Sequence, residues 1–144
     1  ASSLATSSSV GAARPAHCTA LGKILLAELD DDQLKAYLAR RPPAALTAKT
    51  ITDPALIARE IEGVRRTGIA YDDGEFNYEA RCVAMPVYDF TGGVRGAIGI
   101  SGAVWRLSLQ ALEEKSRHVR TAAAELSRQL GYAGAPNRPA TARG

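Results

Sequence analysis

Apolar residues recur near the start of the chain at the spacing of an amphipathic helix. The segment His17–Leu29 carries leucine or isoleucine three, four and eight positions after Leu21, which predicts a helix with one buried stripe. Gly22 falls inside this segment, where glycine costs roughly 1 kcal/mol relative to alanine. A glycine there indicates the close approach of another backbone or a ligand, unless the position simply tolerates it.

Two further helices are predicted on either side of a loop. Asp30–Asp32 can cap a helix that the proline pair at 42–43 ends. Asp53 and Pro54 are of the types preferred at an N-cap and at the first helical position, and Gly68 is of the type that ends a helix. The loop between the two helices then covers roughly residues 42–52.

Two strand-like runs, Arg81–Tyr88 and Val94–Ser101, are joined by a short loop with paired glycines, which predicts a β-hairpin. Side chains alternate between the faces of a strand, so we expect Ile98 and Ile100 to be buried against helices. Ile69–Tyr71 is expected to lead into the hairpin as a further strand. Helices mixed with hairpins, rather than regular βαβ units, indicate an α+β fold.

The other face of the hairpin is a candidate binding surface. Gly99 and Ser101 leave a shallow, weakly polar floor there, and the small residues Cys82 and Ala84 could deepen it. The turn Asp72–Glu75 puts carboxylates near the start of the hairpin, although such a turn could also be simply solvated. A small apolar floor with a few polar atoms at its rim is how a small-molecule pocket is made.

A long helix is predicted near the end of the chain. An apolar seam with helical spacing runs from Leu109 to Leu130, and Gly131 ends it. We expect this seam to belong to the core. Residues 133–144 are rich in Ala, Pro and Gly, which predicts a disordered tail. The Ser- and Ala-rich start of the chain could contain an edge strand at 4–10.

Composition fits one domain with a hydrophobic core. Of the 144 residues, 46% are hydrophobic and 23% are charged. No apolar run approaches the roughly 18 residues of a membrane span, and two cysteines do not make a disulfide framework. The net charge of +3 is spread over scattered basic residues such as the solvated pair Arg65-Arg66, too little to argue nucleic-acid binding by this chain. We therefore expect a cytoplasmic protein without membrane contact.

Several short motifs resemble those of the effector-binding domain of IclR-type transcription regulators. They are His17–Lys23, Thr50–Asp53, the acidic turn Asp72–Glu75, Arg81–Val87 and Ala97–Gly102. Each motif alone is weak, but their order and separations fit the family together. The resemblance covers about residues 9–131, nearly the whole chain.

The resemblance implies a GAF-like or profilin-like curved antiparallel sheet flanked by α-helices. Residues 1–132 would form the effector-binding domain. Complete members carry an N-terminal winged helix-turn-helix and an opening part of the effector domain, and we expect both to be missing from this chain. DNA would then be a partner only through that other domain, and a homodimer or homotetramer is expected. The implied function is allosteric sensing of a small organic or aromatic carboxylate, without catalysis and without a cofactor.

Carried over one residue at a time, the family pattern implies a pocket in which Asp72 bonds a ligand hydroxyl or a bound water. The free N–H groups and the dipole of the helix start near Thr19 would favour an anion such as a carboxylate. The residues implied as ligand-binding are Ala20, Leu21, Asp72, Ala80, Cys82, Gly99 and Ser101.

Alternative interpretations of the reactive residues remain open. His17, Cys18, Asp72 and Cys82 are all metal-competent, but no close spacing such as C-x-x-C supports a metal site. The chain could be a GAF-like enzyme using a cysteine thiolate, although no second cysteine lies near Cys82 in the sequence to resolve a disulfide. It could also be an oligomerisation module with no ligand.

Overall fold

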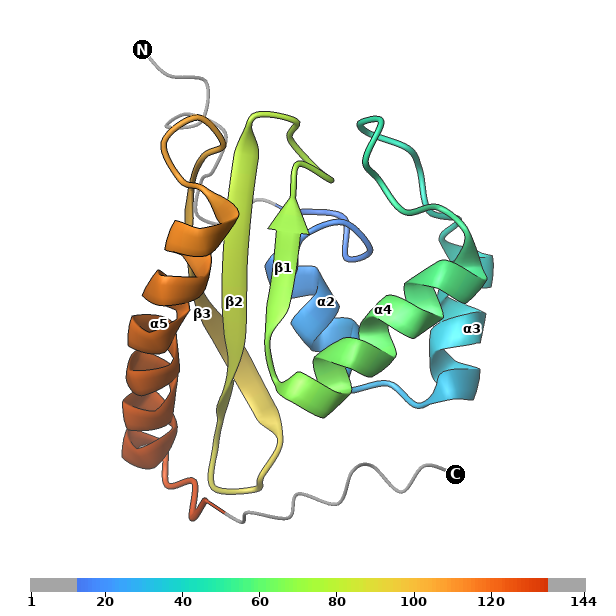
Figure 1. The fold of residues 1–144 in the computed structure, drawn as a ribbon. Helices are drawn as coiled ribbons and strands as arrows, with labels where there is room; N and C mark the ends of the chain where they lie inside the picture. The colour runs from blue at the N-terminus through green and yellow to red at the C-terminus, as the bar shows by residue number, and fades with distance from the viewer. Residues whose placement is uncertain (1–12, 135–144) are drawn as a thin grey trace.

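The computed structural model describes residues 13–134 as an antiparallel sheet with helices on both faces (Figure 1). The α+β prediction is confirmed, as is the hairpin; the suggested edge strand at 4–10 and most of the suggested tail lie outside the described residues. The strands are β1 (Ala70–Asp73), β2 (Ala80–Tyr88) and β3 (Val94–Ala103), in that order across the sheet. The helices are α2 (Ala20–Leu26), α3 (Asp31–Arg40), α4 (Pro54–Thr67) and α5 (Leu109–Gln129).

Helix α5 covers one face of the sheet, where Ile98 and Ile100 pack against the cluster of Val83 and Leu112 but are only partly buried. The predicted seam of α5 is only partly right, because its leucines at 109, 126 and 130 are 40% or more exposed. The buried stripe instead includes two serines, Ser116 and Ser127. Their small side chains let the helix lie close to the sheet, and the Ser127 hydroxyl accepts a hydrogen bond from the backbone N–H of Tyr88.

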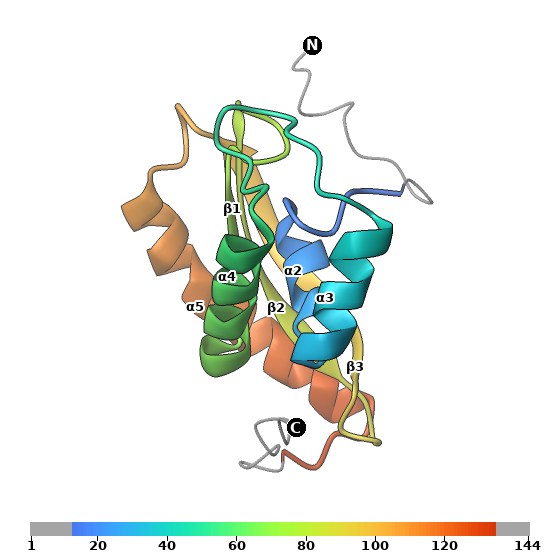
Figure 2. The same ribbon diagram turned by 90° about the vertical axis from the view of Figure 1, so that its right-hand side faces the viewer.

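The opposite face is covered by α2, which packs on the sheet, with α4 and α3 farther out (Figure 1 and Figure 2). The predicted N-caps Asp30 and Asp53 both accept a backbone N–H at the helix starts, and Gly68 ends α4 with a left-handed φ of 71°. The buried side chains of this layer form the larger of two apolar clusters, with Ile24, Leu34, Leu38, Ile57, Ile61 and Val64 at its centre.

Helix α2 is shorter than predicted and turns a different side inward. It begins after Thr19, whose hydroxyl accepts from the Gly22 N–H, and it ends at Leu26 rather than Leu29. Leu21 and Leu25 are about half exposed, whereas Lys23 is fully buried. The predicted stripe is therefore right for Ile24 and wrong for Leu21 and Leu25, because the buried side of the helix is the one that carries Lys23 and Ile24.

Gly22 allows the chain before α2 to pack on the helix. A Cβ added at Gly22 would lie 2.4 Å from the Ala16 Cα, closer than real Cβ atoms approach. The structure therefore confirms one of the explanations for this glycine, the close approach of another backbone.

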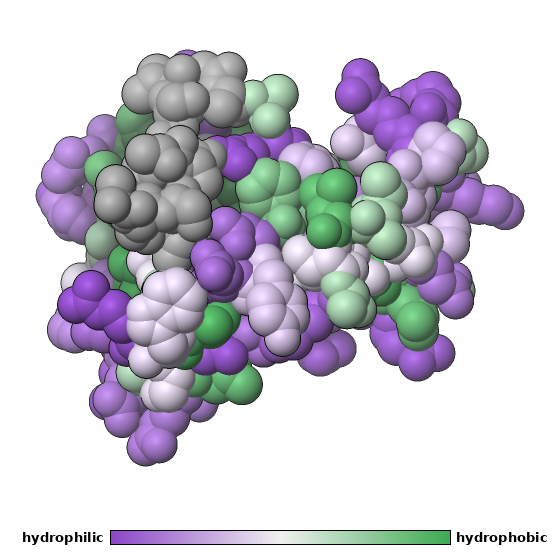
Figure 3. All heavy atoms as spheres, turned by 90° about the horizontal axis from the view of Figure 1, so that it is seen from above, coloured by the Kyte–Doolittle hydropathy of each residue, from purple (hydrophilic) through white to green (hydrophobic). Residues whose placement is uncertain are grey.

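The β1–β2 turn, the loop before α4 and the loop after β3 lie at the same end of the molecule (Figure 1). Seen from that end, the surface carries a central patch of apolar side chains bordered by hydrophilic ones (Figure 3). None of the described helices has the length and apolar character needed to cross a membrane.

Candidate functional site

Three polar side chains form a row across the sheet, on the face covered by α2. Asp72 pairs with Cys82 in the β1–β2 register, and Cys82 pairs with Ser101 in the β2–β3 register. Directly paired residues share a face, and Cys82 packs against the apolar cluster that contains α2. Exposure rises along the row, since Asp72 is 4% exposed, Cys82 is half-buried and Ser101 is exposed. The row is therefore closed at β1 and open to solvent at β3.

Asp72 begins the acidic turn, and its carboxylate is buried rather than solvated. Its Oδ1 accepts a hydrogen bond from the Glu75 N–H at 2.8 Å. Burial raises the pKa of Asp72 to about 6, the Glu75 charge acts in the same direction, and the turn's N–H groups and Lys23 oppose the rise. Asp72 can therefore exchange a proton close to neutral pH.

Lys23 lies beneath this turn and is fully buried. Its Nζ donates to three acceptors: the Tyr71 carbonyl at 2.7 Å, Glu75 Oε2 at 2.8 Å and Glu60 Oε1 at 3.0 Å. An ammonium has three protons, so each can be satisfied by one of these oxygens. The cation thus joins α2 to α4 and to both sides of Asp72.

Sequence reasoning missed Lys23, although a signal was present. Ala20, Lys23, Ile24 and Ala27 follow the i, i+3, i+4, i+7 spacing of a helix face, and all four are buried. A lysine inside such a stripe requires carboxylate partners from elsewhere in the fold, because an unpaired buried charge is very costly. Only the tertiary structure shows that Glu60 and Glu75 supply them.

The two thiols near Asp72 are protonated at neutral pH. Burial, followed by the negative charge of Asp72, raises the pKa of Cys18 and of Cys82 to about 11, against the smaller opposing effect of the Ser101 hydroxyl beside Cys82. A catalytic cysteine needs the reverse, a lowered pKa that yields a thiolate. This environment favours a packing role for both cysteines.

The structure brings several of the sequence-implied ligand residues to one region. Ala20, the first residue of α2, is buried in the cluster that Cys82 contacts, and Ala80 precedes Cys82 by two positions and so shares its face. Leu21, by contrast, is half exposed. Gly99 is exposed at the open side of the floor.

Gly99 also has a structural reason for being glycine. A Cβ at this position would lie 2.2 Å from the Val83 carbonyl oxygen and 3.1 Å from the Ala84 Cα. No other residue fits without movement of the neighbouring strand. The absence of a side chain keeps the floor shallow at this point.

The metal-competent residues are not arranged as a metal site in residues 13–134. No group of three or more His, Cys, Asp or Glu side chains in this part of the chain could hold a metal ion. His17 contacts the Ala44 carbonyl oxygen through Nε2 at 2.9 Å, and Cys18 and Cys82 are free thiols.

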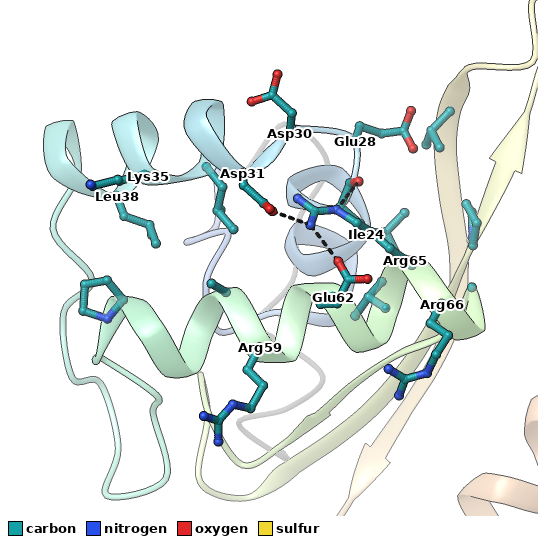
Figure 4. A pocket seen from close by; sticks show the side chains of 18 of the residues that line it. Ile24, Glu28, Asp30, Asp31, Lys35, Leu38, Arg59, Glu62, Arg65 and Arg66 are labelled. Carbon is teal, nitrogen blue, oxygen red and sulfur yellow. Dashed lines mark hydrogen bonds and ion pairs between the residues drawn. The ribbon is translucent and has the colours of Figure 1, made fainter. Parts of the chain in front are cut away.

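A groove of about 1210 Å³ lies among α2, α3 and α4, and none of the sequence-implied residues lines it. Ile24 and Leu38 lie at its apolar base, and Arg65 spans it by pairing with Asp31 and Glu62 (Figure 4). The expectation that Arg65 is solvated was wrong. Its guanidinium also donates to the carbonyl oxygens of residues 27 and 29. These carbonyls lie at the end of the α2 segment, where no helical N–H is available to them.

The family model described as bacterial transcriptional regulator IclR, C-terminal, matches residues 1–128. The chain belongs to the IclR family. It is 38% identical over 123 residues to the Pca regulon regulatory protein of Pseudomonas putida, covering 85% of this chain and 42% of that protein. The IclR-family chain spans about half the length of the curated relatives it matches.

Solved structures agree with this assignment. The repressor BlcR of Agobacterium tumefaciens matches with a TM-score of 0.80 and 29% identity, over 87% of this chain and 51% of that one. The inducer-binding domain of the transcription factor PobR from Acinetobacter, a double mutant in complex with 3-hydroxybenzoic acid, matches with a TM-score of 0.77 and 27% identity. The match covers 79% of this chain and 66% of that one. The IclR effector-domain fold expected from the motifs is therefore confirmed.

Proposed function

We propose that this IclR-family domain binds a small organic carboxylate that also carries a hydroxyl group, at the row formed by Asp72, Cys82 and Ser101. The observation that carries the proposal is the buried Asp72 at the closed end of a floor of small residues. Ala20, Leu21, Ala80 and Gly99 would complete the walls and floor.

The charge balance of the site favours a ligand that donates a hydrogen bond. Asp72, Glu75 and Glu60 are three carboxyl groups around one ammonium, so a further anion placed against Asp72 would be repelled. A ligand hydroxyl can donate to the Asp72 carboxylate, with the ligand's own carboxylate directed toward the open side at Ser101. The 3-hydroxybenzoic acid bound by the PobR domain has both groups, which supports this class.

Binding would act by population shift on DNA binding, with no turnover of the ligand. A ligand changes a regulator only through different affinities for two conformations or assemblies, and a coupling of about 1–3 kcal/mol is typical. The protonated thiols support a sensor rather than a thiolate enzyme. DNA contact would come from a winged helix-turn-helix in the same regulator, and the domain is expected to form homodimers or homotetramers.

The test is titration calorimetry with benzoate, 3-hydroxybenzoate, lactate and pyruvate on the wild type, Asp72→Asn and Asp73→Asn. Asp73 is the matched control, since it is adjacent in β1 and therefore on the other face of the sheet. We expect a hydroxy acid to bind best, at least roughly tenfold weaker binding to Asp72→Asn, and unchanged binding to Asp73→Asn.

Two results would overturn the proposal. One is the absence of any binding below roughly 1 mM across the panel; the other is equal affinity in the two variants. Ligand recovered after overnight incubation should be chemically unchanged. Steady conversion of the ligand that Cys82→Ala abolishes would establish the enzyme interpretation instead.

A further inference from the structure

Asp72 lies near the end of β1, and the turn that follows is held from outside by the hydroxyls of Thr47 and Thr50, which donate to the Gly74 and Glu75 carbonyls. β1 is four residues long and lies at one edge of the described sheet. The Asp72 side chain takes its position from the Glu75 N–H, so any movement of Glu75 moves the hydrogen-bond donor of Asp72. The position of Asp72 therefore depends on what fixes the chain before and after it.

Lys23 supplies that fixation from another element. Its Nζ bonds the carbonyl of Tyr71, the residue before Asp72, and the carboxylate of Glu75, the residue whose N–H Asp72 accepts. Both bonds are short, at 2.7 and 2.8 Å, and the ammonium is out of contact with water, so they are not exchanged for water in the folded state.

We infer that Lys23 is a positioning residue of the ligand site, because it holds the chain on both sides of Asp72 and so helps to fix the Asp72 carboxylate. The inference rests on the proposed function, because Asp72 matters as a ligand contact only there. Lys23 itself would not touch the ligand. Its third bond, to Glu60, ties the same point to α4.

Glu60 provides the matched control for this role. Glu60 and Glu75 are both glutamates bonded to the same Nζ, but only Glu75 belongs to the turn. The charges acting on Asp72 are those of Glu75 and Lys23. Glu60→Gln therefore weakens the lysine's attachment to α4 and leaves the turn and the electrostatics of Asp72 as they are.

The experiment measures the turn without any ligand. Carbon-detected NMR follows the titration of the Asp72 carboxyl, and amide hydrogen exchange follows the Glu75 N–H, in the wild type, Lys23→Met and Glu60→Gln. In Lys23→Met we expect the Asp72 pKa to rise, because a nearby positive charge is lost, and the Glu75 N–H to exchange roughly tenfold faster than in the wild type. Amides in the middle of β2 are followed in parallel to report global unfolding. Glu60→Gln should match the wild type in both the Asp72 titration and the Glu75 exchange.

The inference would be overturned if Lys23→Met folds and shows the same Asp72 pKa and the same Glu75 exchange rate as the wild type. It would also be overturned if Glu60→Gln changed both quantities as much as Lys23→Met does. If Lys23→Met does not fold, Lys23→Gln, which keeps two N–H donors, is judged by the same two criteria. Calorimetry with 3-hydroxybenzoate then separates the two proposals: a wild type that does not bind counts against the proposed ligand, whereas the ligand-free measurements decide the role of Lys23 alone.

Discussion

Lys23 and Arg65 each connect α4 to a neighbouring helix, but Lys23 is buried whereas Arg65 pairs with carboxylates exposed to water. Lys23 is fully buried beside the turn that carries Asp72, with one glutamate from α4 and one from the turn. Arg65, on α4 itself, pairs at the groove with Asp31 and Glu62, whose side chains are 87% and 62% exposed. The two networks have the same composition, one cation with two carboxylates, but differ in access to water.

The difference decides what each network contributes. Removing one member of a buried ion group leaves an uncompensated charge in a low dielectric, whereas solvated carboxylates lose little when their partner is removed. The buried network therefore specifies one arrangement of α2, α4 and the turn. The groove network mostly satisfies the two carbonyls that follow α2.

The sharpest contrast should come from Lys23→Met. Glu75, whose side chain is 11% exposed, would be left as a buried charge without a partner, whereas Glu60, at 38%, remains accessible to water. We expect the free energy of unfolding to fall by about 3 kcal/mol. Urea unfolding followed by circular dichroism measures this. Lys35→Met, at an exposed position of α3, is the control and should change stability by less than about 0.5 kcal/mol. A loss below about 1 kcal/mol for Lys23→Met would show that the buried pairing is not required.

The pH dependence of the stability of Asp72→Asn should reveal the cost of ionising Asp72 in the folded protein. The folded-state pKa of Asp72, about 6, lies above its ordinary value of 3.8, so the native state binds the proton more tightly than the unfolded state. The Asp72 contribution to stability is therefore complete below pH 4 and declines as the pH rises through 6. Asparagine cannot ionise and lacks this decline.

We accordingly expect Asp72→Asn to be more stable than the wild type at pH 7.5, by on the order of 2 kcal/mol, and equal to it near pH 4. Thermal unfolding across this range measures the difference. Asp73→Asn is the control, and it should lose stability at pH 7.5 because Asp73 pairs with Arg81 at 2.7 Å. A pH-independent effect of Asp72→Asn would contradict the assigned pKa.

The smallest effects belong to the groove network. Arg65→Met should cost about 1–2 kcal/mol, mainly through the two carbonyls left without a donor. Asp31→Asn should cost less than about 0.5 kcal/mol, because that carboxylate is exposed. Chemical unfolding of both variants tests the ranking, and a larger loss in Asp31→Asn than in Arg65→Met would reverse the comparison.

The sequence alone determined the hairpin, the helix starts and the family of this protein. Paired glycines between two β-rich runs, and Asp53 followed by proline, are local signals that do not depend on distant contacts, so they could be interpreted directly. The motif order identified the IclR family. It also implied Asp72, Cys82 and Ser101 among the ligand-binding residues, and the strand register pairs Asp72 with Cys82 and Cys82 with Ser101.

Only the tertiary structure decided which face of α2 is buried and what holds Asp72. Hydrophobic spacing favoured the leucines of α2, yet Leu21 and Leu25 are half exposed and Lys23 is buried. Periodicity measures local apolarity, but a lysine can be buried if distant carboxylates neutralise it, and Glu60 and Glu75 are 37 and 52 residues away. The tertiary fold also buries an acidic turn that could have been solvated, and this burial raises the pKa of Asp72 while Lys23 opposes the rise.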